Sequence, residues 1–115
     1  MSKNNIKTSG FSLAKRKELT GDDFYEVKQL DDMTIPVVCD GVGSAQEGAL
    51  AAKKVTLHLI NNFKNLPKAW SIEKAIKEFI TSINSILYAQ SIQEYERPEY
   101  ATTVTVCVIK GNRLY

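Results

Sequence analysis

The chain has 115 residues, of which 43% are hydrophobic and 24% charged, with a net charge of +2. This size and composition predict at most one globular domain, and the slight charge gives no reason to expect nucleic acid or a membrane as partner. No apolar run approaches the ~20 residues of a membrane span, and residues 1–10 lack the apolar centre of a secretory signal. Cys39 and Cys107 lie in apolar runs, which favours reduced, buried thiols in a cytoplasmic protein over the alternative, a Cys39–Cys107 disulfide.

Strands are predicted in the first part of the chain. Residues 6–14 have moderate strand character, and residues 23–30 alternate apolar and polar side chains as a strand does. A turn at residues 31–32 leads into a second strand at 33–40, which we expect to run antiparallel to the first. Pro36 inside this strand indicates an edge position or a bulge, because proline has no N–H to donate.

Two amphipathic helices are predicted next. Ser44 and Glu47 form a capping-box pattern at the start of the first helix, Gly48 suggests close packing there, and Pro67 follows its end. The second helix is expected over residues 71–94. The two helices should form an antiparallel pair on one face of the sheet. Their apolar faces are Ala49, Ala52, Thr56, Leu59 and Phe63 in the first helix, and Ile72, Ile76, Phe79, Ile83 and Leu87 in the second.

The last part of the chain predicts a further hairpin. Residues 101–109, ATTVTVCVI, carry β-branched side chains on both faces, which favours a strand buried on both sides. Gly111 and Asn112 provide a tight turn, and residues 113–115 begin a return strand. Because three residues pair poorly with this strand, we expect the chain to be the front part of a longer domain or to be completed by another chain.

The stretch PVVCDGVG places Asp40 at the end of an apolar strand, directly before Gly41. A carboxylate followed by an accessible carbonyl suits a hard cation such as Mg²⁺ or Mn²⁺, whereas Asp-Gly can equally serve turn geometry alone. Asp22 and Asp23 open the preceding strand, so an antiparallel hairpin would bring them near Asp40. Adjacent carboxylates repel one another, and a divalent cation relieves that repulsion.

The order of three short motifs resembles a known family. These motifs are Gly21-Asp22-Asp23, then Asp40-Gly41-Val42-Gly43 before two helices, and finally Ala101-Thr102-Thr103. Together they look like the N-terminal half of the PPM-type, or type 2C, metal-dependent serine/threonine protein phosphatases, over about residues 6–115. The resemblance implies an α+β fold, in which antiparallel sheets form a sandwich in the complete domain and a helical hairpin packs on the outside.

The resemblance also implies roles for individual residues. Asp40 would be the catalytic ligand that bridges two Mg²⁺ or Mn²⁺ ions, and the Gly41 carbonyl would bind one of them. Asp22 and Asp23 would serve the second ion directly or through water. A metal-activated water would then attack the phosphorus of phosphoserine or phosphothreonine in a protein substrate.

Departures from the family pattern qualify this implication. The position of the usual phosphate-binding arginine is Glu18, and Arg16 could replace it only if the strand carries a bulge. Val42 stands where some members have histidine, and bacterial-type members often have an apolar residue there. Residues 1–115 end before the Gly-Asp-Ser motif, so we expect an N-terminal portion that is inactive alone. The alternative is a non-catalytic module that binds a phosphoprotein or another partner. His58 is expected to be a packing or surface residue.

Overall fold

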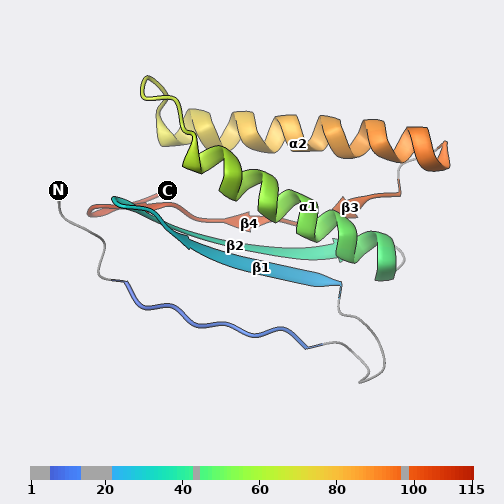
Figure 1. Ribbon diagram of the computed structural model, residues 1–115, viewed down its shortest axis with the longest axis horizontal. Helices are drawn as coiled ribbons and strands as arrows, with labels where there is room; N and C mark the ends of the chain where they lie inside the picture. The colour runs from blue at the N-terminus through green and yellow to red at the C-terminus, as the bar shows by residue number, and fades with distance from the viewer. Residues whose placement is uncertain (1–5, 14–21, 43–44, 97–98) are drawn as a thin grey trace.

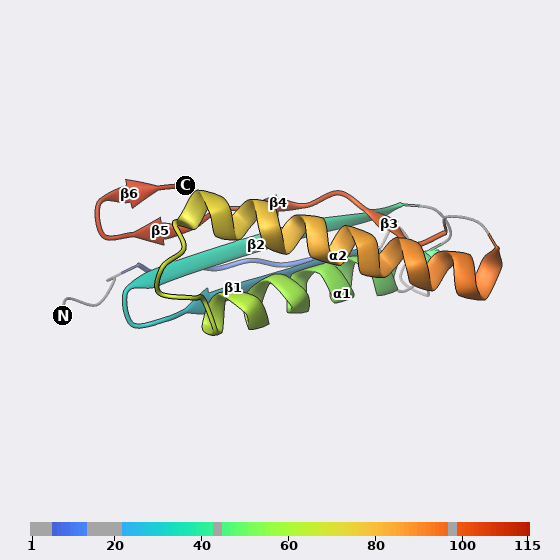
Figure 2. The same cartoon turned by 90° about the horizontal axis from the view of Figure 1, so that it is seen from above.

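The computed structural model describes residues 6–13, 22–42, 45–96 and 99–115. Within them, an antiparallel β-sheet forms one layer and two helices form a second layer on one of its faces (Figures 1 and 2). This arrangement confirms the predicted α+β class with a helical pair on an antiparallel sheet. None of the helices in these ranges has the length and apolar character to cross a bilayer.

The first hairpin joins β1 (Asp23–Gln29) to β2 (Met33–Val42). Leu30 and Met33 close its two-residue turn, with the Leu30 N–H donating to the Met33 carbonyl at 2.8 Å. Strand pairing then follows one register from the turn to the far end, where Asp23 lies opposite Asp40. The predicted turn and both strands are therefore confirmed, and β2 extends two residues beyond the expected end.

On its other side, β2 pairs with three short strands that share a single register: β3 (Ala101–Thr102), β4 (Thr105–Val106) and β5 (Ile109–Lys110). The predicted edge position of Pro36 is therefore wrong, because β2 lies in the middle of the sheet. The Pro36 carbonyl accepts the Cys107 N–H at 3.1 Å, but proline has no N–H to return the bond. Pairing is interrupted at this point, between β4 and β5, so the sheet tolerates an internal proline.

A second tight hairpin follows β5. Its turn contains Gly111 at a φ of +59°, a left-handed conformation that glycine adopts without steric cost. The return strand β6 (Arg113–Leu114) pairs with β5, and Tyr115 extends the ladder by exchanging two backbone hydrogen bonds with Val108. Both the turn and the short return strand were predicted from the sequence.

The helices are α1 (Ala45–Lys64) and α2 (Ile72–Tyr95), and Ser71 caps α2 by accepting the Lys74 N–H. In both views α1 and α2 run in opposite directions over the sheet (Figure 2). The rings of Phe63 in α1 and Phe79 in α2 meet edge to face, with their centroids 5.1 Å apart. The centroid of the Trp70 ring lies 5.9 Å from that of Phe79. The residues between the helices are therefore anchored to the core.

The two faces of the sheet differ in burial. On β2, the side chains of Ile35, Val37 and Cys39 point toward the helices and are fully buried, whereas Val38 on the opposite face is 54% exposed. Thr103 and Thr105 are exposed on that face as well, so the predicted burial of residues 101–109 on both sides is wrong for the described part of the chain. The strand is covered by helices on one face only.

The N-terminal segment lies below this uncovered face of the sheet (Figure 1). Residues 6–13 form no strand, contrary to the expectation for 6–14. Tyr25 Oη donates to the Gly10 carbonyl at 2.6 Å, and Gln29 Nε2 donates to the Ile6 carbonyl at 3.1 Å. The segment touches β1 where Gly10 lies against the Tyr25 ring. Together with β1 and β2 it also lines an open pocket of about 730 Å³.

Helix α1 begins in direct backbone contact with the end of β2. A Cβ atom placed on Gly41 would lie 2.1 Å from the Gly48 carbonyl oxygen and 2.6 Å from the Asp22 carbonyl oxygen. These are main-chain atoms, which cannot rotate away as a side chain can. The close packing expected at Gly48 is confirmed, and its partner is Gly41.

Substituting Gly41→Ala should lower the free energy of unfolding by about 3 kcal/mol, because the new methyl group overlaps two backbone carbonyls. Chemical denaturation followed by circular dichroism measures the change. Val42→Ala, at a neighbouring half-exposed position, is the control and should change stability by less than about 0.5 kcal/mol. Equal stability of Gly41→Ala and the parent chain would contradict the close contact.

Candidate metal centre

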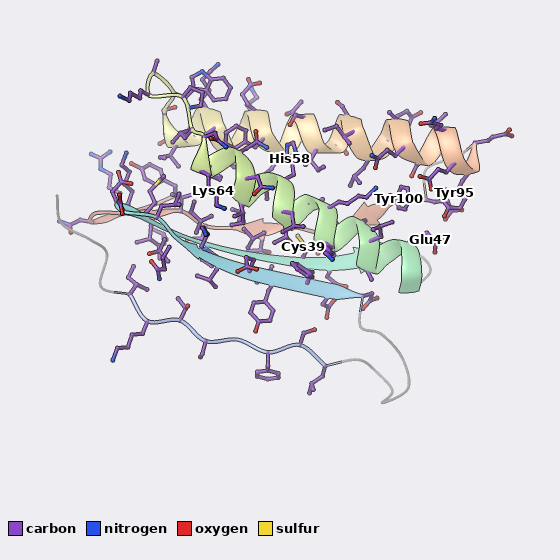
Figure 3. All side chains as sticks on the ribbon, viewed as in Figure 1. Cys39, Glu47, His58, Lys64, Tyr95 and Tyr100 are labelled. Carbon is purple, nitrogen blue, oxygen red and sulfur yellow. The ribbon has the colours of Figure 1, made fainter. Side chains whose placement is uncertain are left out.

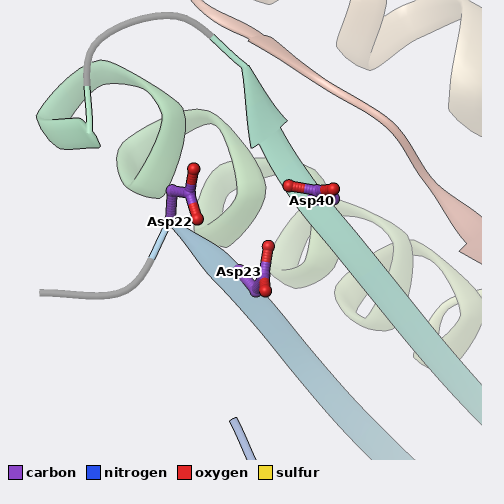
Figure 4. Close-up of side chains that lie close together, drawn as sticks. All are labelled: Asp22, Asp23 and Asp40. Atoms are coloured by element: carbon purple, nitrogen blue, oxygen red, sulfur yellow. The ribbon is translucent and has the colours of Figure 1, made fainter. Parts of the chain in front are cut away.

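Three carboxylates converge at the end of the first hairpin that lies away from its turn (Figure 4). Asp22, Asp23 and Asp40 each offer an oxygen atom, and these atoms all lie within 4.8 Å of one another. Asp22 is half-buried, and the other two side chains are exposed. The hairpin thus assembles an acidic cluster from two segments that lie seventeen residues apart in the sequence.

The backbone around Asp40 is fixed from both sides. On the β1 side, the Gly41 N–H donates to the Asp22 carbonyl at 2.9 Å, which ties the acidic pair to the end of β2. On the other side, the Thr103 N–H donates to the Asp40 carbonyl at 2.8 Å. The Asp40 N–H donates to the hydroxyl of Thr103 at 3.2 Å. These contacts determine where the carboxylates lie.

The donor atoms of the cluster define which ligand it could take. Carboxylate oxygens suit hard cations such as Mg²⁺, Mn²⁺ and Ca²⁺, whereas zinc and copper sites favour imidazole or thiolate ligands. Cys39 precedes Asp40, but its side chain points to the opposite, helix-covered face and is fully buried. The cluster therefore offers only oxygen ligands among the side chains that the structure describes there.

Behind Asp40, a buried polar contact joins β2 to α1. The Thr56 hydroxyl lies 2.9 Å from the Ala52 carbonyl and 3.3 Å from the Cys39 sulfur. Burial raises the pKa of the Cys39 thiol above its usual value, although the hydrogen bond from Thr56 opposes this shift. Cys39 therefore remains a neutral packing residue at neutral pH, and both cysteines are free thiols as expected.

A second polar cluster, which the sequence patterns did not predict, lies at the end of α2 (Figure 3). Tyr95 Oη donates to Glu47 in the first turn of α1 at 3.1 Å, and Tyr100 Oη donates to Glu94. The bond to Glu94 raises the pKa of Tyr100 above its usual value. The Ser91 hydroxyl accepts the N–H groups of residues 99 and 100, which ties the start of β3 to α2. No periodic pattern signals these contacts, because they join residues from different elements.

Other residues singled out in the sequence lie elsewhere. Arg16, Glu18 and Ser44, the predicted cap of the first helix, fall outside the described residues. His58 on α1 contacts the Ser82 hydroxyl on α2 at 2.7 Å, between the helices, and burial lowers its pKa. Its contact with a neighbouring helix agrees with the expected packing role.

Comparisons with known proteins place this fold. A sequence model described as protein phosphatase 2C matches residues 12–115. The crystal structure of RsbX in complex with magnesium superposes with a TM-score of 0.62 at 17% identity, covering 87% of this chain and 41% of RsbX. A second similar structure contains the PP2C phosphatase domain and a regulatory-domain fragment of SpoIIE from Bacillus subtilis. It superposes with a TM-score of 0.60 at 21% identity, covering 84% of this chain and 26% of the SpoIIE chain. Among curated protein sequences, none matches this chain.

The fold and the match over residues 12–115 define the class as a PP2C-type phosphatase fold, which is an α+β fold. Phosphatases of this family depend on metal ions. The chain belongs to the protein phosphatase 2C family, as the resemblance of its motifs implied. It spans less than half the length of either similar structure, RsbX or SpoIIE.

The two thiols should differ in reactivity toward Ellman's reagent. Cys107 is partly exposed and Cys39 is fully buried, while burial raises the pKa of both. We expect Cys107 to react faster as the pH rises from 7 to 9, because its thiolate fraction grows, and Cys39 to react only in denaturant. The Cys107→Ser variant isolates Cys39, and rapid labelling of that variant in buffer would contradict its burial.

If the acidic cluster holds a divalent cation, Mn²⁺ should stabilise the folded chain. At a concentration one hundred times the dissociation constant, the gain in unfolding free energy is about 2.7 kcal/mol. Thermal unfolding with and without Mn²⁺ measures it. Asp40→Asn should remove the gain, whereas Asp31→Asn, an acidic-to-amide change in the distant hairpin turn, should retain it. An undiminished gain in Asp40→Asn would contradict binding at the cluster.

Proposed function

We propose that this chain belongs to a phosphatase that hydrolyses phosphoserine or phosphothreonine in proteins with the help of two divalent cations, Mg²⁺ or Mn²⁺. The observation that carries the proposal is the convergence of Asp22, Asp23 and Asp40 within 4.8 Å, in a chain of the protein phosphatase 2C family. The magnesium complex of RsbX, a structure with the same fold, supports a hard cation here.

Each residue of the cluster has a proposed part. Asp40 would be the principal carboxylate ligand of the cations, and it lies on β2, across the hairpin from Asp23 on β1 (Figure 4). The Gly41 carbonyl and the carboxylates of Asp22 and Asp23 supply further oxygen ligands. Arg16 remains the candidate for binding substrate phosphate.

When bound, the cations lower the pKa of a coordinated water and stabilise negative charge on the phosphoryl oxygens. The chain's own part is to hold carboxylate oxygens at fixed positions with little rearrangement. Pairing of β1 with β2 and the bonds from Gly41 to Asp22 and from Thr103 to Asp40 provide that rigidity.

We further propose that residues 1–115 form the N-terminal portion of a larger phosphatase domain and are inactive alone. Each Mg²⁺ or Mn²⁺ ion takes about six oxygen ligands, several of them waters, so two ions held by three carboxylates and one carbonyl leave room for further protein ligands. The coverage of 41% of RsbX supports this, as does the sheet face on which Val38 is 54% exposed. The remaining ligands and the second sheet would come from the rest of the same domain or from a second chain. The free thiols fit a cytoplasmic location.

The second candidate is a non-catalytic module that binds a phosphoprotein or another partner. Two features favour it: the sheet face that the helices leave uncovered, and the outer edge of β3 and β4, which pairs with no strand among the described residues. Both could accept another chain. The two candidates differ in one respect that can be measured, namely the release of phosphate.

The full-length protein should release inorganic phosphate from a phosphoserine or phosphothreonine peptide only when Mn²⁺ or Mg²⁺ is present. Asp40→Asn should reduce the rate by more than about 100-fold, beyond the 10- to 100-fold typical of changes outside the ligand sphere. A malachite-green assay measures the rate, and Asp31→Asn serves as the control with unchanged activity. Undiminished turnover in Asp40→Asn would exclude the proposed centre, and an inactive protein that still binds phosphopeptide would favour the module.

A further inference from the structure

The pairing of residues 40 and 103 departs from a regular antiparallel ladder. Residues at such a position normally exchange two backbone hydrogen bonds. Here the Thr103 N–H donates to the Asp40 carbonyl at 2.8 Å, but the Asp40 N–H donates to the Thr103 hydroxyl at 3.2 Å. The Thr103 carbonyl instead accepts from the Thr102 hydroxyl at 2.8 Å. A side chain therefore replaces the backbone partner of Asp40.

The hydroxyl of Thr103 contacts Asp40 at two points. Besides the N–H contact, it lies 3.4 Å from the Asp40 carbonyl oxygen. Together with the backbone bond from its own N–H, Thr103 thus holds both main-chain polar groups of Asp40. The ladder is interrupted on this side of β2 between β3 and β4, so Thr103 provides the strand-to-strand link there.

We propose that Thr103 is a positioning residue that fixes the Asp40 carboxylate for cation binding. The inference rests on the proposed function of the acidic cluster and adds a residue that contributes no metal ligand. The Cα position of Asp40 determines where its carboxylate meets those of Asp22 and Asp23. Loss of the Thr103 hydroxyl would leave the Asp40 N–H without its acceptor and let the end of β2 shift.

A valine at position 103 has nearly the shape of threonine and cannot accept a hydrogen bond, whereas serine keeps the hydroxyl. Thr105 offers a matched control, because it is also exposed, lies on the same face of the same extended segment and pairs with Val38 instead of Asp40. Its hydroxyl makes no hydrogen bond to a residue in the described ranges. Thr105→Val thus repeats the chemical change away from the cluster.

The experiment measures the dissociation constant of Mn²⁺ for the full-length protein, from the electron paramagnetic resonance signal of the free ion. We expect Thr103→Val to weaken binding about tenfold, in the range found when a residue that supports metal ligands is removed. Thr103→Ser and Thr105→Val should stay within about twofold of the parent, since support of the ligands is retained. Circular dichroism confirms that each variant is folded, and Thr103→Ala is a second variant that lacks the hydroxyl without added bulk.

Binding by folded Thr103→Val or Thr103→Ala within about twofold of the parent would overturn the inference. An equal loss in Thr105→Val or in Thr103→Ser would also overturn it, because the effect would not depend on the hydroxyl at position 103. Asp40→Asn separates this result from failure of the proposed function. If the parent and Asp40→Asn bind Mn²⁺ equally, the metal centre itself is wrong and the role of Thr103 fails with it.

Discussion

The register of the hairpin between β1 and β2 is the constraint on which the candidate site depends. The two-residue turn after Leu30 fixes which residues face one another, and seven pairs later Asp23 lies opposite Asp40. Because side chains alternate between faces, a shift by one residue would turn Ile35, Val37 and Cys39 out of the core. Burial of these three side chains therefore specifies the position of the acidic cluster, although none of them takes part in it.

The three carboxylates of the cluster lie close together although like charges repel one another. Two unit charges about 4 Å apart repel by about 1 kcal/mol even in water, and more where the surroundings are less polar. Asp23 and Asp40 remain exposed, so solvent screens their charges, and the hairpin can hold them together without a buried charge. The direct contact of Gly41 with Gly48 then places the start of α1 against this end of the sheet. The fold thus tolerates a modest repulsion that a divalent cation would relieve.

Local patterns in the sequence predicted much of the fold. Alternation in residues 23–30, the short turns and the helical spacing of apolar residues each depend on neighbours within one element. The predicted edge position of Pro36 and the predicted two-sided burial of residues 101–109 were wrong, because both properties depend on distant segments and not on neighbours within one element. Pro36 occupies the central strand because the ladder breaks between β4 and β5, a feature that residue 36 alone does not reveal.

The same distinction applies to the site. Its acidic residues lie at the two ends of one hairpin, so their proximity could be predicted from the sequence. The residue that holds Asp40 comes from farther away, since Thr103 is 63 residues from it in the sequence. The separate polar cluster at the end of α2 likewise joins Tyr95 to Glu47 across 48 residues. Threonine and tyrosine are common in strands and helices for packing reasons, so their type carries no signal of such a role. The chain shares its fold with structures of only 17–21% identity. In this chain, the hairpin register and the backbone contact at Gly41 are what place the acidic cluster.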